Sequence, residues 1–188
     1  MAAMNVADGL DLLPGDDGEL PVTVRWVVMA DTPEAVAVDG DTLYVAGFTL
    51  AAYDVADGSL RWEYEDDDGM EASGGVRIGT DGPDVVRVFA PWEFDVRVDR
   101  RDGTLVSRDS AGGAPPPDFA RLPSSAPAAF RIVGGLEETT AYWPDGRVAW
   151  RLRVESPAVD PAGALEVNGA IVCMTSGQHV VVLDPVRS

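Results

Sequence analysis

The dipeptide Asp-Gly returns at a nearly constant interval along this chain. It occurs at Asp57-Gly58, Asp102-Gly103 and Asp145-Gly146, so the three glycines are 45 and 43 residues apart. A further step of about 42 residues ends at Ser188, the last of the 188 residues. A fixed period of about 20 to 50 residues is typical of solenoids, propellers and related arrays. The interval therefore predicts about four structural units of about 43 residues each.

The first of these units is predicted to consist of four short antiparallel strands. Apolar runs at 35–38, 43–48, 50–54 and 60–64 are rich in β-branched or aromatic residues and are bounded by Gly and Asp. The Asp-Gly turns have a physical basis, because Gly takes positive φ without steric cost and Asp bonds its own nearby backbone. No stretch shows convincing helical periodicity. Comparable runs lie at 85–89, 170–174 and 179–183, so we expect an all-β fold.

The fourth unit ends where its outermost strand should begin. Residues 182–184 match residues 52–54 in register, and the sequence reaches only to Ser188. The segment 21–28 precedes the first unit and resembles an orphan fourth strand, with Trp26 placed like the tryptophans of later units. We therefore predict that this N-terminal strand completes the last unit and closes a ring of about four blades, which would remove an exposed sheet edge.

The domain organisation follows from this prediction. Residues 1–20 are expected to be a flexible acidic N-terminus, and 21–188 a single β-propeller-like repeat domain. A long loop rich in Pro, Gly and Ser is expected near 111–127, with at most a short strand at 119–122 in the third unit. Long loops on a rigid scaffold often carry function, although a simple insertion is the other interpretation.

The run from Ala52 to Trp62 resembles the repeat of pyrroloquinoline-quinone-type β-propellers. That repeat reads Ala-x-Asp-x-x-Thr-Gly-x-x-x-Trp, and four of its five marked positions are present, with Asp57 in place of Thr. Later units keep the motif only in part, with Ser107 at a Trp position and Tyr142 at an Asp position. The positions that carry the repeat are Ala52, Asp54, Gly58, Trp62, Asp99, Gly103, Gly146, Trp150 and Asp184, together with Trp26.

The resemblance implies a shape rather than a reaction. In such repeats the Gly makes the turn and the Trp packs between neighbouring blades. Members of the family usually carry seven or eight blades. A chain with about four could be a compact monomeric ring, or a half-ring that pairs with a second copy into eight blades.

The charge of the chain limits its partners. The 32 acidic residues outnumber the 14 basic ones, all of which are Arg, and give a net charge of −18 at pH 7. Such a field repels nucleic-acid phosphates and anionic membranes, so neither is an expected partner. It favours a basic protein or a cation, although a surface that serves only solubility is an alternative.

Few residues suggest chemistry. His179 and Cys173 are the only residues of their kinds, and each lies in an apolar strand where a structural role is expected. One Cys and one His cannot supply the four ligands of a zinc site. The acidic run 63–71 lacks the spacing of a calcium loop and is expected to be a solvated loop between blades, with a carboxylate site for calcium as the alternative. No catalytic residue, cofactor or metal site is therefore predicted, and the resemblance implies a non-catalytic member.

The leading functional hypothesis is a non-enzymatic, protein-binding propeller of the adaptor or inhibitor type, with an acidic surface that steers a basic partner. The alternatives are a self-assembling half-propeller with a structural role, and a carboxylate-based enzyme or sugar-binding propeller. The absence of a secretory signal and of a membrane-length apolar run suggests a cytoplasmic location. Aromatic residues at turns and the acidic run offer possible partner contacts, namely Trp92, Phe94, Tyr142, Trp143, Asp66, Asp67 and Asp68.

Overall fold

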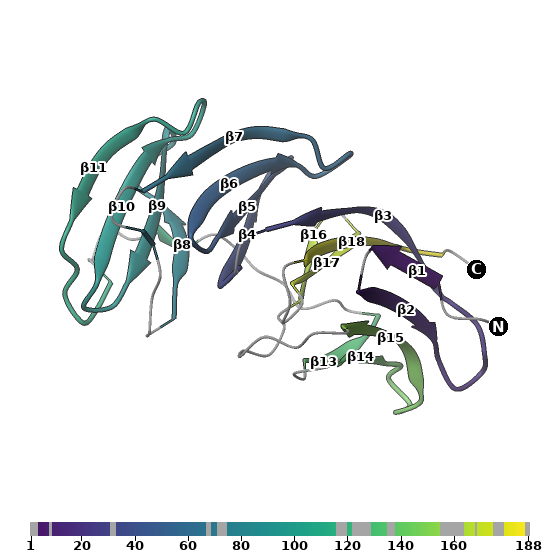
Figure 1. The fold of residues 1–188 in the computed structure, drawn as a ribbon. Coiled ribbons are helices and arrows are strands. Elements are labelled where there is room, and N and C mark those ends of the chain that lie inside the picture. Colours follow the sequence, from purple (N-terminus) through teal and green to yellow (C-terminus); the bar gives the residue numbers. More distant parts are fainter. Residues whose placement is uncertain are drawn as a thin grey trace. The chain divides into compact units, whose positions relative to one another are not determined.

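The structure is a computed structural model, drawn in Figure 1. The residues that it describes are 4–7, 9–30, 33–66, 69–70, 75–115, 120–121, 129–134, 138–154, 164–167, 169–174 and 179–186. Every helix or strand assigned among these residues is a β-strand, which confirms the predicted all-β class. The described part of the chain has no helix long and apolar enough to cross a membrane.

The chain divides into two compact units, and residues 30–123 form one of them. This unit contains two antiparallel sheets. The first sheet consists of β4 (Ala35–Asp39), β5 (Thr42–Ala46), β6 (Thr49–Asp54) and β7 (Leu60–Glu65) in chain order. The second sheet has the order β11-β10-β9-β8-β12, with β8 (Arg77–Thr80), β9 (Val85–Ala90), β10 (Phe94–Asp99), β11 (Leu105–Asp109) and β12 (Ala120–Arg121).

Residues 1–29 and 124–188 form the other unit, again with two antiparallel sheets. The third sheet has the order β1-β2-β15-β14-β13, with β1 (Met4–Ala7), β2 (Leu10–Pro14), β13 (Arg131–Gly134), β14 (Glu138–Tyr142) and β15 (Val148–Val154). The fourth sheet has the order β16-β17-β18-β3, with β16 (Ala164–Val167), β17 (Ala170–Met174), β18 (His179–Pro185) and β3 (Val22–Met29). Four sheets thus match the predicted number of repeats.

The predicted pairing of the N-terminal strand with the last repeat is confirmed. β3 lies beside β18 and is the outermost strand of the fourth sheet (Figure 1). Trp26 pairs with Val182, just as Trp62 pairs with Ala52 in the first sheet. The observed register is therefore the one that the sequence match between residues 182–184 and 52–54 predicts. A strand from the start of the chain therefore occupies the place that β7 has in the first sheet.

A shift in pairing register at the fourth strand of the repeat is common to all four sheets. In each sheet it falls at the residue just before the position of the repeat Trp, on β7, β11, β15 and β3. In the first sheet that residue is Arg61, whose Nη2 donates to Asp54 at 2.6 Å. In the fourth it is Arg25, which pairs with Asp184. The same Asp–Arg pair thus forms within one hairpin in the first sheet and between opposite ends of the chain in the fourth.

The expectation of a flexible terminus at 1–20 is wrong for residues 4–7 and 10–14. These residues form the hairpin β1–β2, and β2 pairs with β15 at the outer edge of the third sheet. Leu10 and Leu12 are fully buried. Burial of two leucines from an alternating Leu-Asp-Leu run offsets the cost of ordering the segment, in spite of its acidic flank.

The short strand expected within 119–122 is present as β12, but in a different sheet from the one expected. It pairs with β8 in the second sheet, and it is not part of the third repeat. Residues 111–115 carry no strand, as predicted for the Pro-, Gly- and Ser-rich segment, and 116–119 and 122–127 lie outside the described residues. The third sheet instead gains strands from the N-terminal hairpin.

The repeated Asp-Gly turns have the expected geometry. Gly58, Gly103 and Gly146 have φ of 75°, 74° and 90°, which suits a residue without Cβ. In each turn the Asp carboxylate accepts a hydrogen bond from the backbone N–H two residues further on, at 2.9, 3.0 and 3.1 Å. The turn chemistry read from the sequence therefore fixes these three loops.

Each compact unit has its own apolar core. In residues 30–123 the core lies between the first and second sheets and includes Tyr44, Trp62, Val88 and Phe94. In the other unit it gathers residues from the third and fourth sheets, among them Leu12, Trp150 and Leu183. Each core is continuous within its own unit and holds the ends of its sheets in place.

Candidate functional site

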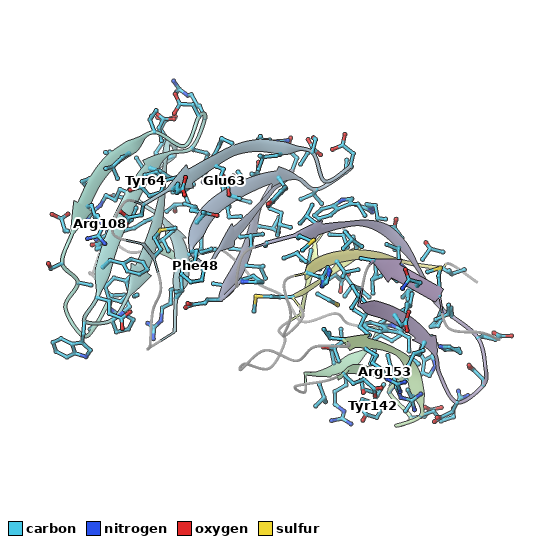
Figure 2. The ribbon with its side chains drawn as sticks, in the orientation of Figure 1. Phe48, Glu63, Tyr64, Arg108, Tyr142 and Arg153 are labelled. Atoms are coloured by element: carbon cyan, nitrogen blue, oxygen red, sulfur yellow. The ribbon has the colours of Figure 1, made fainter. Side chains whose placement is uncertain are left out.

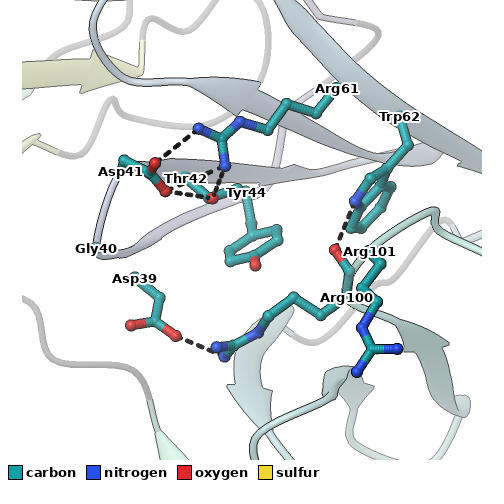
Figure 3. Close-up of a pocket in the computed structure, with 9 residues that line it drawn as sticks. All are labelled: Asp39, Gly40, Asp41, Thr42, Tyr44, Arg61, Trp62, Arg100 and Arg101. Atoms are coloured by element: carbon teal, nitrogen blue, oxygen red, sulfur yellow. Dashed lines mark hydrogen bonds and ion pairs between the residues drawn. The ribbon is translucent and has the colours of Figure 1, made fainter.

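A pocket of about 400 Å³ lies between the first and second sheets. Its walls come from the β4–β5 turn, from β7 and from the turn that follows β10 (Figure 3). The lining residues are Asp39, Gly40, Asp41, Thr42, Tyr44, Arg61, Trp62, Arg100 and Arg101. The pocket therefore forms where the repeat Trp of one sheet meets the repeat turn of the next.

Trp62 joins the two sheets. Its indole Nε1–H donates to the carbonyl oxygen of Arg100 at 2.8 Å (Figure 3). Its ring packs beside Tyr44, with 5.9 Å between the centroids, and lies directly over Gly103. The role that the repeat motif implies for this Trp, packing between neighbouring sheets, is therefore seen in the first repeat.

Gly103 is needed for two separate reasons. Its φ of 74° disfavours any residue with a Cβ, and a Cβ placed there would lie 2.6 Å from Cε3 of Trp62. Gly146 holds the same motif position with φ of 90°, but a Cβ there would meet nothing within 4 Å. A substitution at Gly146 therefore tests backbone strain alone, whereas the same substitution at Gly103 tests strain together with contact with Trp62.

We expect Gly103→Ala to destabilise the protein clearly more than Gly146→Ala. The second change should cost about 1–2 kcal/mol because of left-handed strain alone. The first adds displacement of a buried Trp, for which overpacking typically costs a further 1–3 kcal/mol or so. Thermal or urea unfolding of both variants measures the difference. Equal losses would show that Trp62 does not need the close approach to this turn.

The charged groups of the pocket are already paired. Arg61 contacts Asp41 at 3.0 Å and donates to the hydroxyl of Thr42 at 2.7 Å. Arg100 pairs with Asp39 at 2.5 Å (Figure 3). The remaining lining guanidinium, that of Arg101, pairs with Asp84 at 3.0 Å, outside the pocket. Of these pairs, Arg100–Asp39 joins the loops of the two sheets.

Two ionisable groups of the pocket keep a single protonation state near neutral pH. Hydrogen bonds from Arg61 lower the pKa of Asp41, so this carboxylate stays ionised near neutral pH. Burial raises the pKa of Tyr44, so its phenol keeps its proton. The Thr42 hydroxyl donates to the Asp41 carboxylate at 3.2 Å and accepts from Arg61, so these lining groups hold one another in place.

Two of the predicted partner contacts are buried, which corrects the sequence prediction. Phe94 is only 2% exposed and belongs to the core between the first two sheets. The carboxylate of Asp66 is 4% exposed and accepts a bond from Nε of Arg108 on β11 at 2.7 Å (Arg108 is labelled in Figure 2). Both residues fasten β-sheets instead of meeting a partner. Asp67 and Asp68 lie outside the described residues.

Tyr142 and Trp143 are half-buried and packed within their own unit. The guanidinium carbon of Arg131 lies 4.6 Å from the centroid of the Tyr142 ring (Tyr142 is labelled in Figure 2). Trp143 packs against Phe130, with 4.9 Å between the centroids. These contacts fit the structural alternative for this turn, in which its aromatic residues pack inside the fold.

Trp92 is the one predicted aromatic contact that lies on the surface. It is 80% exposed and follows Pro91 in the turn between β9 and β10. Its φ is +67°, and no other residue besides glycine has a positive φ in the described part of the chain.

Cys173, which was expected in the core, and His179 are both buried. Burial raises the pKa of the Cys173 thiol to about 12, so the neutral thiol dominates at physiological pH. Burial lowers the pKa of His179. The residues that the structure describes contain no group of three or more His, Cys, Asp or Glu placed to hold a metal ion.

An ion-pair network on β9 and β10 was not found by sequence reasoning. Arg87 is 1% exposed, and its Nε and Nη2 donate to the two carboxylate oxygens of Asp95 at 2.7 and 2.5 Å. Arg97 also contacts Asp95, at 3.3 Å, and reaches Asp81 and Asp109. The sequence signal for this network was the presence of charged residues at alternating positions of two paired strands. Alternate residues of a strand lie on the same face of the sheet.

The fold and the pocket define an all-β protein whose antiparallel sheets are joined by repeat tryptophans and paired charges. No protein-family model and no curated protein matches the sequence. Several solved structures are similar to this chain. One is BamB from Moraxella catarrhalis, with 14% identity over 97% of this chain and 57% of that chain, and a TM-score of 0.33.

Two further solved structures are similar. One is the quinohemoprotein alcohol dehydrogenase from Comamonas testosteroni, with 18% identity over 70% of this chain and 23% of that chain, and a TM-score of 0.38. The other is the computationally designed Ika4 protein, with 12% identity over 79% of this chain and 89% of that chain, and a TM-score of 0.33. This chain thus spans 57% and 23% of the lengths of the two natural proteins. The four-sheet architecture of this chain follows from its own strand pairing.

Proposed function

We propose that this chain is a non-enzymatic, protein-binding β-propeller whose acidic surface attracts a basic protein. The observation that supports this proposal is the internal use of its arginines. In the part of the chain that the structure describes, ten arginines pair with a carboxylate of the same chain, namely Arg25, Arg61, Arg87, Arg97, Arg100, Arg101, Arg108, Arg147, Arg151 and Arg153. Most positive charge is therefore neutralised locally, and the carboxylate surplus sets the outward field.

Part of that surplus is held in place by the repeat turns. Asp57 and Asp102 are exposed, and bonds from Ser59 and Thr104 lower the pKa of each carboxylate. They remain ionised at neutral pH because backbone and hydroxyl donors favour the charged form. Glu65 on β7 and Glu19 are also exposed. Such surface carboxylates speed the encounter with a basic protein more than they tighten the final complex.

The test has two stages. The tagged chain is used to capture proteins from a lysate of its source organism at about 50 mM and about 500 mM salt, where screening differs strongly. The captured protein is then purified, and its association rate is measured with the wild type and with a variant carrying Glu19→Gln, Asp57→Asn, Glu65→Gln and Asp102→Asn. Each change removes charge but keeps the shape of the side chain, and Asn can still accept the turn hydrogen bond.

We expect one basic protein, held at low salt and released at high salt, whose association with the neutralised variant slows about tenfold or more at low salt. Recovery of the chain's own copies alone, unaffected by salt, would overturn the proposal in favour of a self-assembling half-propeller. A captured sugar or small substrate in place of a protein would favour the carboxylate-based alternative.

A further inference from the structure

Trp92 occupies a position that its own side chain makes unfavourable. The N–H of Glu93 donates to the carbonyl of Ala90 at 3.2 Å, which closes a four-residue turn with Pro91 second and Trp92 third. The third position of a turn with positive φ is normally Gly or Asn, because a Cβ is strained there. Trp92 adopts φ of +67° in spite of this cost.

Burial does not offset the strain. Trp92 is 80% exposed, more than any other large apolar side chain in the described residues. A buried Trp would gain stability by leaving water, but this one gains little. Strain and exposure at one residue are independent observations, and a large aromatic side chain that costs stability in the free protein points to a role outside it.

The ring is nevertheless held in a defined place. The backbone N–H of Trp92 donates to the carbonyl of Gly112 at 3.2 Å. The six-membered part of the indole lies against Gly113, where a Cβ would come within 2.1 Å of Cζ2. The glycine pair after β11 therefore supports one side of the ring and leaves the rest open. A pre-positioned aromatic side chain loses little conformational entropy when it binds.

We propose that Trp92 is an anchor on which an Arg or Lys side chain of the basic partner stacks. Three features favour a cationic occupant. The indole is the strongest cation–π acceptor among the side chains. The chain carries a net charge of −18, which attracts cations and repels anions. The nearby end of β11 places Asp109 four residues before Gly113, and its carboxylate stays 62% exposed although it pairs with Arg97 at 2.9 Å. This inference rests on the proposed binding of a basic protein.

The experiment uses the full chain and two defined peptides, acetyl-(Gly-Arg)₄-amide and the neutral acetyl-(Gly-Gln)₄-amide. Nitrogen-15 NMR follows the indole N–H signals, and the signal of Trp92 is assigned by its loss in Trp92→Phe. We expect the arginine peptide to shift the Trp92 signal saturably and the glutamine peptide to leave it in place. Trp92→Leu should bind the arginine peptide about tenfold more weakly, since Leu is apolar but has no ring.

Trp92→Gly provides the control for folding. Gly takes positive φ freely, so this variant should melt at the same temperature as the wild type or higher while losing the same affinity. If the arginine peptide binds in a salt-dependent way but equally well to Trp92→Leu, the anchor is wrong and the basic-partner proposal stands. If the glutamine peptide shifts Trp92 equally, cation recognition is wrong. If neither peptide binds the wild type, the attraction for basic partners itself fails.

Discussion

Removal of residues 1–29 is expected to unfold the unit formed by residues 1–29 and 124–188. The deletion takes away β3, which pairs with β18, and β2, which pairs with β15. It also removes the buried side chains Leu10, Leu12, Val22 and Trp26. Each large apolar side chain contributes about 1.5–3 kcal/mol by burial, so their joint loss approaches the whole stability of a typical domain, about 5–15 kcal/mol.

Amide hydrogen exchange distinguishes this outcome from a general loss of structure. In the truncated chain the amides of β17 and β18 should lose their protection, while those of β5 and β9 provide the reference within residues 30–123. Addition of a synthetic peptide of residues 1–29 should restore protection in β18 if the segment acts by pairing. The variant Thr23→Ala changes an exposed position of β3 and should behave like the wild type. A truncated chain with unchanged protection in β18 would mean that the closing strand contributes no stability.

Asp95→Ala is expected to cost about 3–5 kcal/mol of unfolding free energy, which is typical when one partner of a buried ion pair is removed. Asp95 accepts hydrogen bonds from Nε and Nη2 of the Arg87 guanidinium, and Arg87 is 1% exposed. The loss leaves a buried cation without the carboxylate that compensates its desolvation. Urea unfolding followed by circular dichroism measures the change.

Asp109→Ala is the matched control, because Asp109 belongs to the same network. It pairs with Arg97 at 2.9 Å, but its carboxylate is 62% exposed, so its removal should cost less than about 1 kcal/mol. The double variant Arg87→Met with Asp95→Leu should recover much of the stability that Asp95→Ala loses, because it leaves no unpaired charge. Similar losses for Asp95→Ala and Asp109→Ala would show that burial does not decide the strength of this network.

The local features of the fold could be read from the sequence because they depend on a few neighbouring residues. Positive φ at Gly58 and Gly103 and the accepting carboxylates of Asp57 and Asp102 are properties of short segments. The equivalence of β3 with β7 was also predictable, since Trp26 follows an Arg as Trp62 does. In both sheets that Arg pairs with the repeat Asp.

The candidate contacts were harder to predict. Phe94 lies near a predicted turn, and Asp66 lies in an acidic run. From the sequence, both segments were expected to be exposed to solvent. Their burial depends on a second sheet packing against the first, which no local pattern specifies. The strain at Trp92 had a local signal, the Pro-Trp turn, but its exposure could only be seen in three dimensions.

The sequence by itself determined the repeat, the strands, the turns and the closing strand, because periodicity and turn chemistry act over short distances. The tertiary structure alone decided that β2 pairs with β15, that β12 joins β8 and that Arg87 and Asp95 form a buried pair. A strand offers the same backbone donors and acceptors to any neighbour. The strand that it pairs with therefore depends on which apolar faces and charges can be buried together, and this depends on the whole tertiary structure.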